Sequence, residues 1–384
     1  MYNLTTTCRF GGVETFVWSV SRELAKQGNA VHIIGGKGKI QRDIPGVKIS
    51  VFPFWPRNRI PNLGTRFQKL GERWSMGLLA FSHVLKERYD IFHIHKPFDL
   101  PLGWGVKKKA GSKLVLGSHG TDFFPGDRIF AQAADRIVSC SEFNARQIRE
   151  RYGIRPEVIY NGIDPEVFRP LPSDRELWQR FGIQPGDKVI VFAGRLIGLK
   201  GVGHLLRAMA RLDKKCSWRL ILIGEGEARP NLEKLVRELG IQARVTFCGY
   251  ISNHELPRYY SIADLAVFPS LADETFGVAI CEAMACGRAV ISTRVGGIPE
   301  LVIDGESGVL VEPKNWEDLA QRISQVLMDD HQRSRLGGRA LERVRQHFTW
   351  EKVAERLRKT YEAILSAEKK EDAVKGIPAS DSHP

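Results

Sequence analysis

The stretch DLAVFPSLADETFGVAICEAMACGRAV, residues 264–290, decides the fold that we expect of this chain. It passes from an apolar, strand-like run through a loop with serine and proline into a segment of helical length. Short apolar runs and amphipathic helical segments alternate in the same way along almost the whole sequence. This alternation indicates βαβ units and predicts an α/β protein with parallel sheets.

The strand candidates form two groups, which predicts two sheets and two domains. The first group comprises residues 30–34, 47–52, 90–95, 113–118, 136–140 and 157–160, and the second comprises 188–194, 218–224, 244–249, 264–270 and 289–293. Prolines and turn-forming residues interrupt both periodicities at 161–176, so we expect the boundary near Leu171. Ligands of open parallel sheets bind beyond the carboxyl ends of the strands, and we therefore expect the active cleft between the domains.

Both ends of the chain carry expectations of their own. Only ten residues precede Gly11, and MYNLTTTCRF makes a poor central strand, so the start looks clipped. The natural product is expected to extend upstream by about one strand of five or six residues. A final helix is predicted at 350–366, and a polar, disordered tail at 367–384.

Composition and charge exclude several classes of protein. The 384 residues, 43% hydrophobic and 26% charged, suit a globular protein of two domains. No apolar run reaches the ~18 residues of a membrane span, and no signal-peptide pattern opens the chain, so a cytoplasmic location is expected. Of the net charge of +13, most lies in residues 1–172, which hold 26 Lys and Arg against 15 Asp and Glu. Such a basic surface can attract nucleic acid, an anionic membrane or a phosphorylated substrate. The alternative is a solvated surface whose extra lysines have no binding role.

Several sequence motifs are incomplete. In the Gly-Glu-Gly run at 224–226, the position of the third glycine of a dinucleotide fingerprint is Arg229, and GGKGK at 35–39 lacks the Ser or Thr of a Walker A loop. The six cysteines include no C-x-x-C pair, no two aspartates are spaced as D-x-D, and His254-Glu255 has no second histidine four residues after the first. A nicotinamide enzyme and an NTPase are thus disfavoured, and no metal is expected.

The run FAGRLIGLKG, residues 192–201, is the first positive signal. A strand ends at Gly194 and delivers Arg195 and Lys200 to a loop that opens the next helix. Two cations beside a helix N-terminus suit a diphosphate. The alternative is that both are ordinary surface cations on a helix cap.

Two carboxylates in the opening stretch are the second signal. Glu274 lies in the loop before the helix, where it can accept hydrogen bonds from sugar hydroxyls, and Gly277 lets the backbone approach a ligand. Glu282 lies inside the first turns of an apolar helix, where an unpaired carboxylate is costly, which favours a ligand such as ribose. The alternative is an ordinary helix glutamate.

Together these motifs resemble glycosyltransferase family 4. The resemblance rests on the Glu274-x7-Glu282 spacing, the loop with Arg195 and Lys200, GGIPELV at 296–302 and DGESGVLVEP at 304–313. It extends along nearly the entire chain through GGVETF (11–16), SHGTD (118–122), YNGID (160–164) and FTWEKVAERL (348–357). The fold it implies is GT-B: α/β, with two Rossmann-like doubly wound domains facing each other across a cleft.

The resemblance implies a retaining transferase that uses a nucleoside-diphosphate sugar without a metal or other cofactor. Arg195 and Lys200 would hold the diphosphate and neutralise the leaving group. Glu282 would bind the ribose and Glu274 the donor sugar. The phosphates would meet the backbone of Phe276, Gly277 and Val278.

The resemblance also assigns roles to residues of the expected N-terminal domain, which we call the front domain. Gly11 and Gly12 would approach the donor phosphate and the acceptor, and His119 would lie over the sugar. Without the family, His119 is more simply a satisfied core histidine. Domain 1–170 would be the acceptor side and 171–349 the nucleotide-sugar side, with helix 350–366 crossing back to the front domain. Thr275 stands where the family usually has Gly or Pro, which affects sugar selectivity.

Residues 56–88 form a basic amphipathic segment. Seven Lys and Arg face only Glu72 and Glu87, and they interleave with Phe67, Trp74, Leu78 and Phe81 at near-helical spacing. Such a segment can rest on an anionic membrane and present a lipid-linked or phosphorylated acceptor. The alternative is a helix packed on the core with solvated cations.

The expected function is transfer of a hexosyl or N-acetylhexosaminyl group from a UDP- or GDP-sugar to a glycan or lipid-linked acceptor. Cell-surface polysaccharide, lipopolysaccharide or glycolipid synthesis would be its setting, on the inner face of the plasma membrane. Alternatives are another GT-B activity, such as sugar-nucleotide epimerisation or phosphorolysis, and a non-catalytic nucleotide-binding partner. Nucleic-acid binding is the weakest alternative, because the basic residues lack a recognised motif.

Overall fold

The chain folds into two compact units. The computed structural model describes residues 1–9, 11–40, 42–120, 122–213, 216–272 and 274–375. The N-terminal unit comprises 1–160 and the chain from Trp350 onward, and the C-terminal unit comprises Asn161–Thr349. The boundary thus follows Tyr160, where we expected it at 170, because the Ile163 N–H donates to Phe348 O at 2.7 Å and ties this segment to the C-terminal unit.

The C-terminal unit is built on a six-stranded parallel sheet in the order β12-β11-β10-β7-β8-β9. Its strands are β7 (Lys188–Ala193), β8 (Trp218–Ile223), β9 (Val245–Gly249), β10 (Leu265–Phe268), β11 (Ala289–Thr293) and β12 (Val309–Val311). Each strand predicted from the second half of the sequence has a counterpart. The prediction missed β12, whose three residues are too short to show a pattern.

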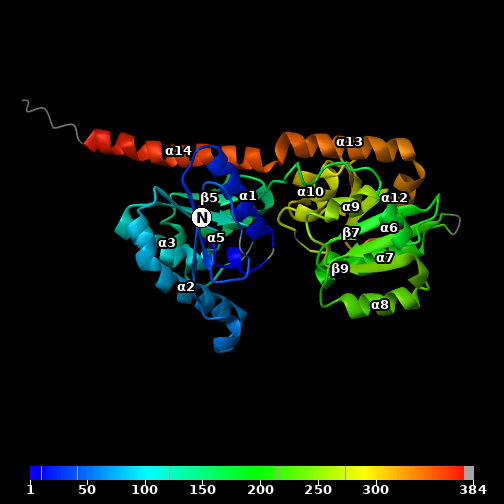
Figure 1. Ribbon diagram of the computed structural model, residues 1–384, viewed down its shortest axis with the longest axis horizontal. Coiled ribbons are helices and arrows are strands. Elements are labelled where there is room, and N and C mark those ends of the chain that lie inside the picture. Colours follow the sequence, from blue (N-terminus) through cyan, green and yellow to red (C-terminus); the bar gives the residue numbers. More distant parts are fainter. Residues whose placement is uncertain (10, 41, 121, 214–215, 273, 376–384) are drawn as a thin grey trace, which may run out of the picture. The chain divides into compact units, whose positions relative to one another are not determined.

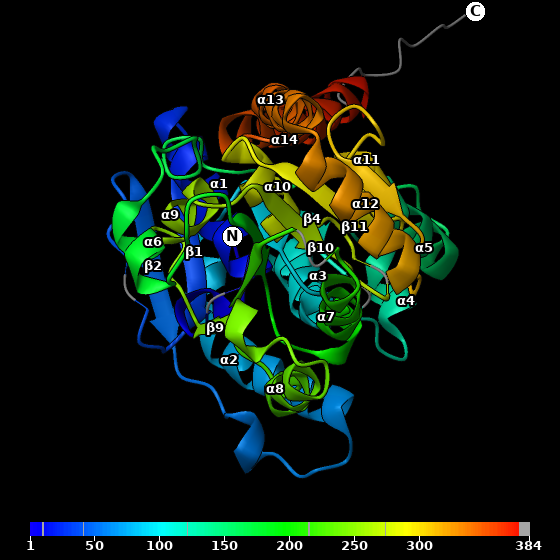
Figure 2. The same cartoon turned by 90° about the vertical axis from the view of Figure 1, so that its right-hand side faces the viewer.

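Helices cover both faces of this sheet. They are α6 (Arg175–Arg180), α7 (Val202–Ala210), α8 (Arg229–Glu238), α9 (Leu256–Ser261), α10 (Val278–Ala285), α11 (Ile298–Leu301), α12 (Trp316–Met328) and α13 (Asp330–His347). Helix α7 contacts α8 and α12, whereas α10 contacts α9 and α13 (Figure 2). Right-handed crossovers that leave β7 and β10 in opposite directions place their helices on opposite faces, so the unit is doubly wound.

The N-terminal unit also has a parallel sheet. Its strands are β1 (Val31–Gly36), β2 (Val47–Phe52), β3 (Ile91–Ile94), β4 (Lys113–Ser118), β5 (Arg136–Ser139) and β6 (Glu157–Val158). They form a β1-β2 pair and a β3-β4-β5-β6 sheet. Tyr2 bridges both, in parallel with Ile34 and with Ile94. The opening residues, expected to make a poor strand, therefore join the sheet at its centre as far as Asn3, before a 3-10 turn at Leu4–Thr7.

The helices of the N-terminal unit include the last helix of the chain. They are α1 (Gly12–Lys26), α2 (Thr65–Glu87), α3 (Leu100–Ala110), α4 (Asp127–Ala131), α5 (Glu142–Tyr152) and α14 (Trp350–Lys375). Helix α14 lies along α1 (Figure 1). Trp350, Val353 and Leu357 of α14 share a core with Phe16 and Val20 of α1.

Helix α14 continues to Lys375, beyond the predicted end at 366. The predicted tail is therefore helical over its first residues, because Glu, Lys and Ala at 367–373 are good helix formers. Its remainder, 376–384, lies outside the described residues. No helix in the described part of the chain is both long enough and apolar enough to cross a membrane.

Candidate functional site

The sheet of the C-terminal unit has a topological switch point between β7 and β10. Strand β7 pairs with β8 on one side and with β10 on the other, so the chain turns in opposite directions after these two strands. The loops that follow them, 194–201 after β7 and the described residues 269–272 and 274–277 after β10, start side by side at the carboxyl edge of the sheet and lead to helices on opposite faces. Open α/β sheets bind ligands at this point.

These two loops are held together by main-chain contacts. The Leu271 N–H donates to Leu199 O at 2.8 Å. Gly201 ends the first loop with φ +69°, and a Cβ at this position would lie 1.9 Å from Pro269 O. Only glycine permits this approach, so the sequence fixes the loop that carries Arg195 and Lys200 against the loop after β10.

The structure brings Lys200 and Glu274 into an ion pair, although 74 positions separate them. The Lys200 side chain is 24% exposed and that of Glu274 25%, so solvent and ligands reach both. The Gly297 N–H holds the Glu274 carbonyl at 2.7 Å, which assigns a structural task to the glycines of GGIPELV. Arg195 lies on the same loop as Lys200 and is exposed.

Helix α10 begins directly after the second loop. Gly277 precedes it in the left-handed region, φ 94°, which favours glycine, and Val278 is the first helical residue. Phe276 is buried and packs edge-on against Phe348, with ring centroids 5.6 Å apart. This packing anchors the start of α10, whose free N–H groups can face an anion.

Glu282 lies in the second turn of α10 and is 7% exposed. Burial raises the pKa of its carboxyl group to about 8. The Tyr260 hydroxyl donates to Ala279 O on the same helix at 3.2 Å and fixes the helix in place. At pH 7 the Glu282 carboxyl group is therefore mostly protonated in the free protein, and it can donate as well as accept hydrogen bonds.

In the N-terminal unit, Gly11, Gly12 and His119 lie at the carboxyl edge of the sheet. Gly11 caps α1, Gly12 is its first residue, and His119 directly follows β4. The Phe16 ring, one turn into α1, meets the His119 ring edge-on at 4.7 Å between centroids. Burial, and then Lys96, lower the pKa of His119 to about 3, so its imidazole is neutral.

Sequence reasoning missed residues that surround His119. His95 Nδ1 lies 3.3 Å from His119 Nε2, so His95 orients this ring. Lys69 and Lys96 each donate to Asp122 at 2.8 Å, which places two ammonium groups near the SHGTD loop. The sequence did contain a signal for these residues, because His95 and Lys96 follow the strand β3. In a parallel sheet the end of β3 lies beside the end of β4, where His119 is found.

The predicted site residues are divided between the two units, and among those of the C-terminal unit the structure pairs the side chains of Lys200 and Glu274. Gly11, Gly12 and His119 belong to the N-terminal unit, and Arg195, Lys200, Glu274, Phe276, Gly277, Val278 and Glu282 belong to the C-terminal unit. Among the described residues, the one group of His, Cys, Asp and Glu close enough to hold a metal ion lies on β1 and α2 and includes none of them.

Comparisons with known proteins agree with this architecture. The model of the family "Glycosyl transferases group 1" matches residues 173–343, and that of "Glycosyltransferase Family 4" matches residues 10–167. A D-inositol 3-phosphate glycosyltransferase of Mycolicibacterium smegmatis is 32% identical over 391 residues, which cover 93% of this chain and 87% of the relative.

Two solved structures have a similar fold. Sucrose-phosphate synthase from Thermosynechococcus elongatus aligns with a TM-score of 0.82 at 24% identity, covering 95% of this chain and 98% of the other. HepE of Anabaena in complex with UDP-glucose aligns with a TM-score of 0.76 at 22% identity, covering 94% and 98%.

Proposed function

The chain belongs to the group 1 and family 4 glycosyltransferases and has the GT-B fold, and from this premise we propose a retaining, metal-independent sugar transfer from a UDP- or GDP-sugar. The transferred group is a hexosyl or N-acetylhexosaminyl residue. The acceptor is a glycan or a lipid-linked molecule of cell-surface polysaccharide, lipopolysaccharide or glycolipid synthesis, and the enzyme works at the inner face of the plasma membrane.

The observation that carries the proposal is the pairing of Lys200 with Glu274 at the switch point of the C-terminal sheet. A diphosphate bound there meets the Lys200 ammonium, the exposed Arg195 and the N-terminus of α10. As the bond to the sugar breaks, negative charge grows on the diphosphate, and cations fixed beside it lower the barrier. These protein groups supply the positive charge that a metal ion would otherwise provide.

The two carboxyl groups suit the two ends of the donor. Lys200 exchanges part of its contact with Glu274 for the diphosphate, which leaves Glu274 oxygens to accept sugar hydroxyls. Glu282, buried in α10, receives the ribose hydroxyls. In this arrangement Phe276, Gly277 and Val278 offer main-chain N–H groups to the phosphates, and Thr275 contributes to the choice of sugar.

The acceptor side is proposed to be the N-terminal unit. Gly11, Gly12 and the neutral His119 lie at its carboxyl edge, where Lys69 and Lys96 add positive charge beside Asp122. One relative is named for D-inositol 3-phosphate, an anionic acceptor, and such chemistry suits these lysines. HepE was solved with UDP-glucose, which supports a nucleotide-sugar donor.

A panel of UDP, GDP, ADP and their sugars tests the donor site by thermal stabilisation. We expect one base to raise the melting temperature, because a ligand that binds only the native state stabilises it. Arg195→Ala removes this shift, whereas Lys234→Ala, on the exposed face of α8, retains it. Equal or absent shifts with every nucleotide would contradict the proposal.

Product analysis separates transfer from the alternatives. Incubation with the stabilising nucleotide-sugar and EDTA is expected to release the nucleoside diphosphate and to transfer the sugar to water or to the hydroxyl of an added acceptor, in a product that keeps the donor's anomeric configuration. An epimerase instead inverts a carbon of the sugar ring, whether the sugar stays attached to the nucleotide or is released. A non-catalytic partner releases no nucleoside diphosphate. An absolute requirement for added divalent metal would contradict metal independence.

Membrane contact through residues 56–88 is proposed from the exposed face of α2. Leu78 is 80% exposed, and Phe67 and Trp74 lie on the same face at helical spacing, while Met76, Ala80 and Val84 face the core. The alternative of a helix packed only on the core leaves this apolar face unexplained.

Sedimentation with liposomes tests the contact. Binding is expected to anionic vesicles and to weaken at least severalfold in Leu78→Asp, because the side chain inserts into the interface. Met328→Asp is the control and should bind normally, because Met328 is an apolar residue of similar size in the C-terminal unit and is 70% exposed. Equal binding to neutral vesicles, or none, would reject the contact.

A further inference from the structure

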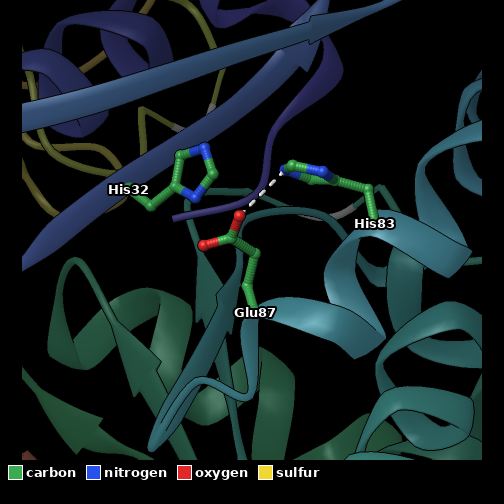
Figure 3. A group of neighbouring side chains, drawn as sticks. All are labelled: His32, His83 and Glu87. Atoms are coloured by element: carbon green, nitrogen blue, oxygen red, sulfur yellow. Dashed lines mark ion pairs between the residues drawn. The ribbon is translucent and has the colours of Figure 1, made fainter.

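We propose that His32, His83 and Glu87 form a binding site for a divalent transition-metal ion, most suitably Zn²⁺, in the N-terminal unit. His32 lies on β1, and His83 and Glu87 lie in the last turns of α2. One ligand atom of each residue lies within 4.8 Å of those of the other two (Figure 3). The site includes no residue of the proposed donor site, so it goes beyond the transfer reaction.

The geometry of α2 presents two ligands together. His83 and Glu87 are four positions apart, which puts them on one face of the helix. Glu87 Oε1 lies 3.7 Å from His83 Nε2, as the dashed line in Figure 3 marks. In a tetrahedral zinc site with bonds of about 2.1 Å, ligand atoms lie about 3.4 Å apart. Small side-chain rotations therefore bring all three ligand atoms to bonding distance.

The His83 ring is poised for a ligand. Its Nε2 atom is buried and has no hydrogen-bond partner among the described residues, and the 3.7 Å to Glu87 is too long for one. The side chains of His83 and Glu87 are nevertheless 32% and 29% exposed, which gives an ion access from solvent. An unsatisfied nitrogen facing a carboxylate is a cost that a bound cation would remove.

His32 supplies a neutral imidazole with supporting contacts. Burial lowers its pKa to about 4, so the ring is uncharged at pH 7, as a metal ligand must be. Ser50 Oγ lies 2.8 Å from Nε2, and the Tyr89 hydroxyl lies 2.5 Å from Nδ1. The metal replaces one of these contacts, and the other remains to orient the ring.

Two histidines and one carboxylate favour zinc over calcium or magnesium. Imidazole nitrogen suits Zn²⁺, whereas the hard cations require oxygen ligands. Water would complete the fourth position. The bound ion would join β1 to the end of α2, the helix that we propose meets the membrane, and would fix its orientation.

The positive charge of Lys48 disfavours binding of a metal ion at this site. The Lys48 ammonium donates to Glu87 Oε1 at 2.7 Å and occupies one lone pair of the candidate ligand. The Lys48 side chain is 56% exposed, so it can swing into solvent. Because a cation so near repels the metal, removing this charge should strengthen binding.

Titration of the full chain with Zn²⁺ against a chromophoric chelator tests the site, with Co²⁺ absorption as a second readout. We expect one ion bound at this site in the wild-type protein and a four-coordinate Co²⁺ spectrum. His83→Gln and Glu87→Gln should each weaken this binding by tenfold or more. His331→Gln, a histidine of α13 in the C-terminal unit, is the matched control and should bind as the wild type does.

Lys48→Met should bind Zn²⁺ severalfold more tightly than the wild type. A misfolded variant would lose affinity, so a gain in affinity cannot be explained by misfolding. Melting temperatures without metal check that the variants fold. Added Zn²⁺ should raise the melting temperature of the wild type, of Lys48→Met and of the control His331→Gln, and should raise it much less in His83→Gln and Glu87→Gln. Unchanged affinity in His83→Gln and Glu87→Gln, or no gain in Lys48→Met, would overturn the site. Donor binding by the C-terminal unit is measured separately and is unaffected by either outcome.

Discussion

At the scale of single residues, the ion pair of Lys200 with Glu274 is the feature on which the proposed donor site depends. In the free protein the Lys200 side chain remains about a quarter exposed. Breaking a fully buried ion pair would cost much free energy, whereas a fully exposed ion pair would contribute little stability. In the function that we propose, this partial exposure lets an incoming diphosphate compete with Glu274 for the lysine.

Loss of this charge is the first prediction. Lys200→Ala or Arg195→Ala should lower turnover by about 10²-fold or more, because the growing charge on the leaving group loses its stabilisation. Steady-state kinetics measure this effect, with Lys234→Ala on α8 as a control of equal chemistry. Near-normal turnover in either variant would remove that residue from the reaction.

Glu282 predicts a pH dependence of stability. Its pKa rises from an ordinary 4.5 to about 8 in the fold. Below pH 4.5 the folded and unfolded states are both protonated. Between the two values only the unfolded carboxyl ionises, which stabilises the unfolded state, so the free energy of unfolding falls as pH rises and levels off above pH 8.

Glu282→Gln removes this penalty. The variant should gain stability over the wild type progressively from about pH 5 to pH 8, and chemical denaturation at several pH values measures the gain. Glu238→Gln, whose side chain is 56% exposed on α8, is the control. A gain that does not change with pH would show that Glu282 does not titrate in this range.

At the scale of elements, the two loops of the switch point act as one structure. The contact at Gly201 and Pro269 joins the loop after β7 to the loop after β10. This main-chain packing therefore holds the backbone of the loop that carries Arg195 and Lys200 against the loop after β10.

Gly201→Ala tests this joining. The added Cβ would meet Pro269 O at 1.9 Å in a backbone conformation that disfavours alanine, so both donor affinity and thermal stability should fall. Gly198→Ala, three residues earlier in the same loop, meets nothing within 4 Å and should leave stability nearly unchanged. Similar behaviour of the two variants would contradict the role of the contact.

At the scale of the whole molecule, the last helix returns to the unit in which the chain begins. Helix α14 belongs to the N-terminal unit, and its apolar side chains complete a core with α1. The N-terminal unit therefore contains both ends of the described chain, and it cannot complete its core until synthesis has passed Leu357.

A cavity in this core should affect one unit only. Leu357→Ala removes a fully buried side chain and should cost about 2–5 kcal/mol, seen as a lower melting transition of the N-terminal unit. A nucleotide bound at the switch point should raise the other transition. Calorimetry resolves the two, with the exposed Arg356→Ala as the control. A single transition that moves as one in both experiments would contradict independent units.

The amino-acid sequence by itself determined the classes and order of the elements. Alternating apolar runs and helical segments predicted parallel sheets, two domains, and the strand ends that carry Arg195, Lys200 and His119. These features depend on patterns within a few residues, because the local backbone preference and the spacing of buried side chains determine whether a segment forms a helix or a strand. Strand β12 escaped because its three residues are too few to show a pattern. The extra length of α14 escaped because the polar composition after 366 was taken to indicate disorder, although several of these residues favour helix.

Only the tertiary structure decided which distant residues meet. It paired Lys200 with Glu274, set His95 against His119, returned α14 to α1, moved the boundary to Tyr160, and gathered His32 with His83 and Glu87. Such contacts arise from strand order and crossover direction, which juxtapose segments far apart in the chain. Periodicity within a segment says nothing about its neighbour in the sheet, and for this reason the partners had to come from the fold.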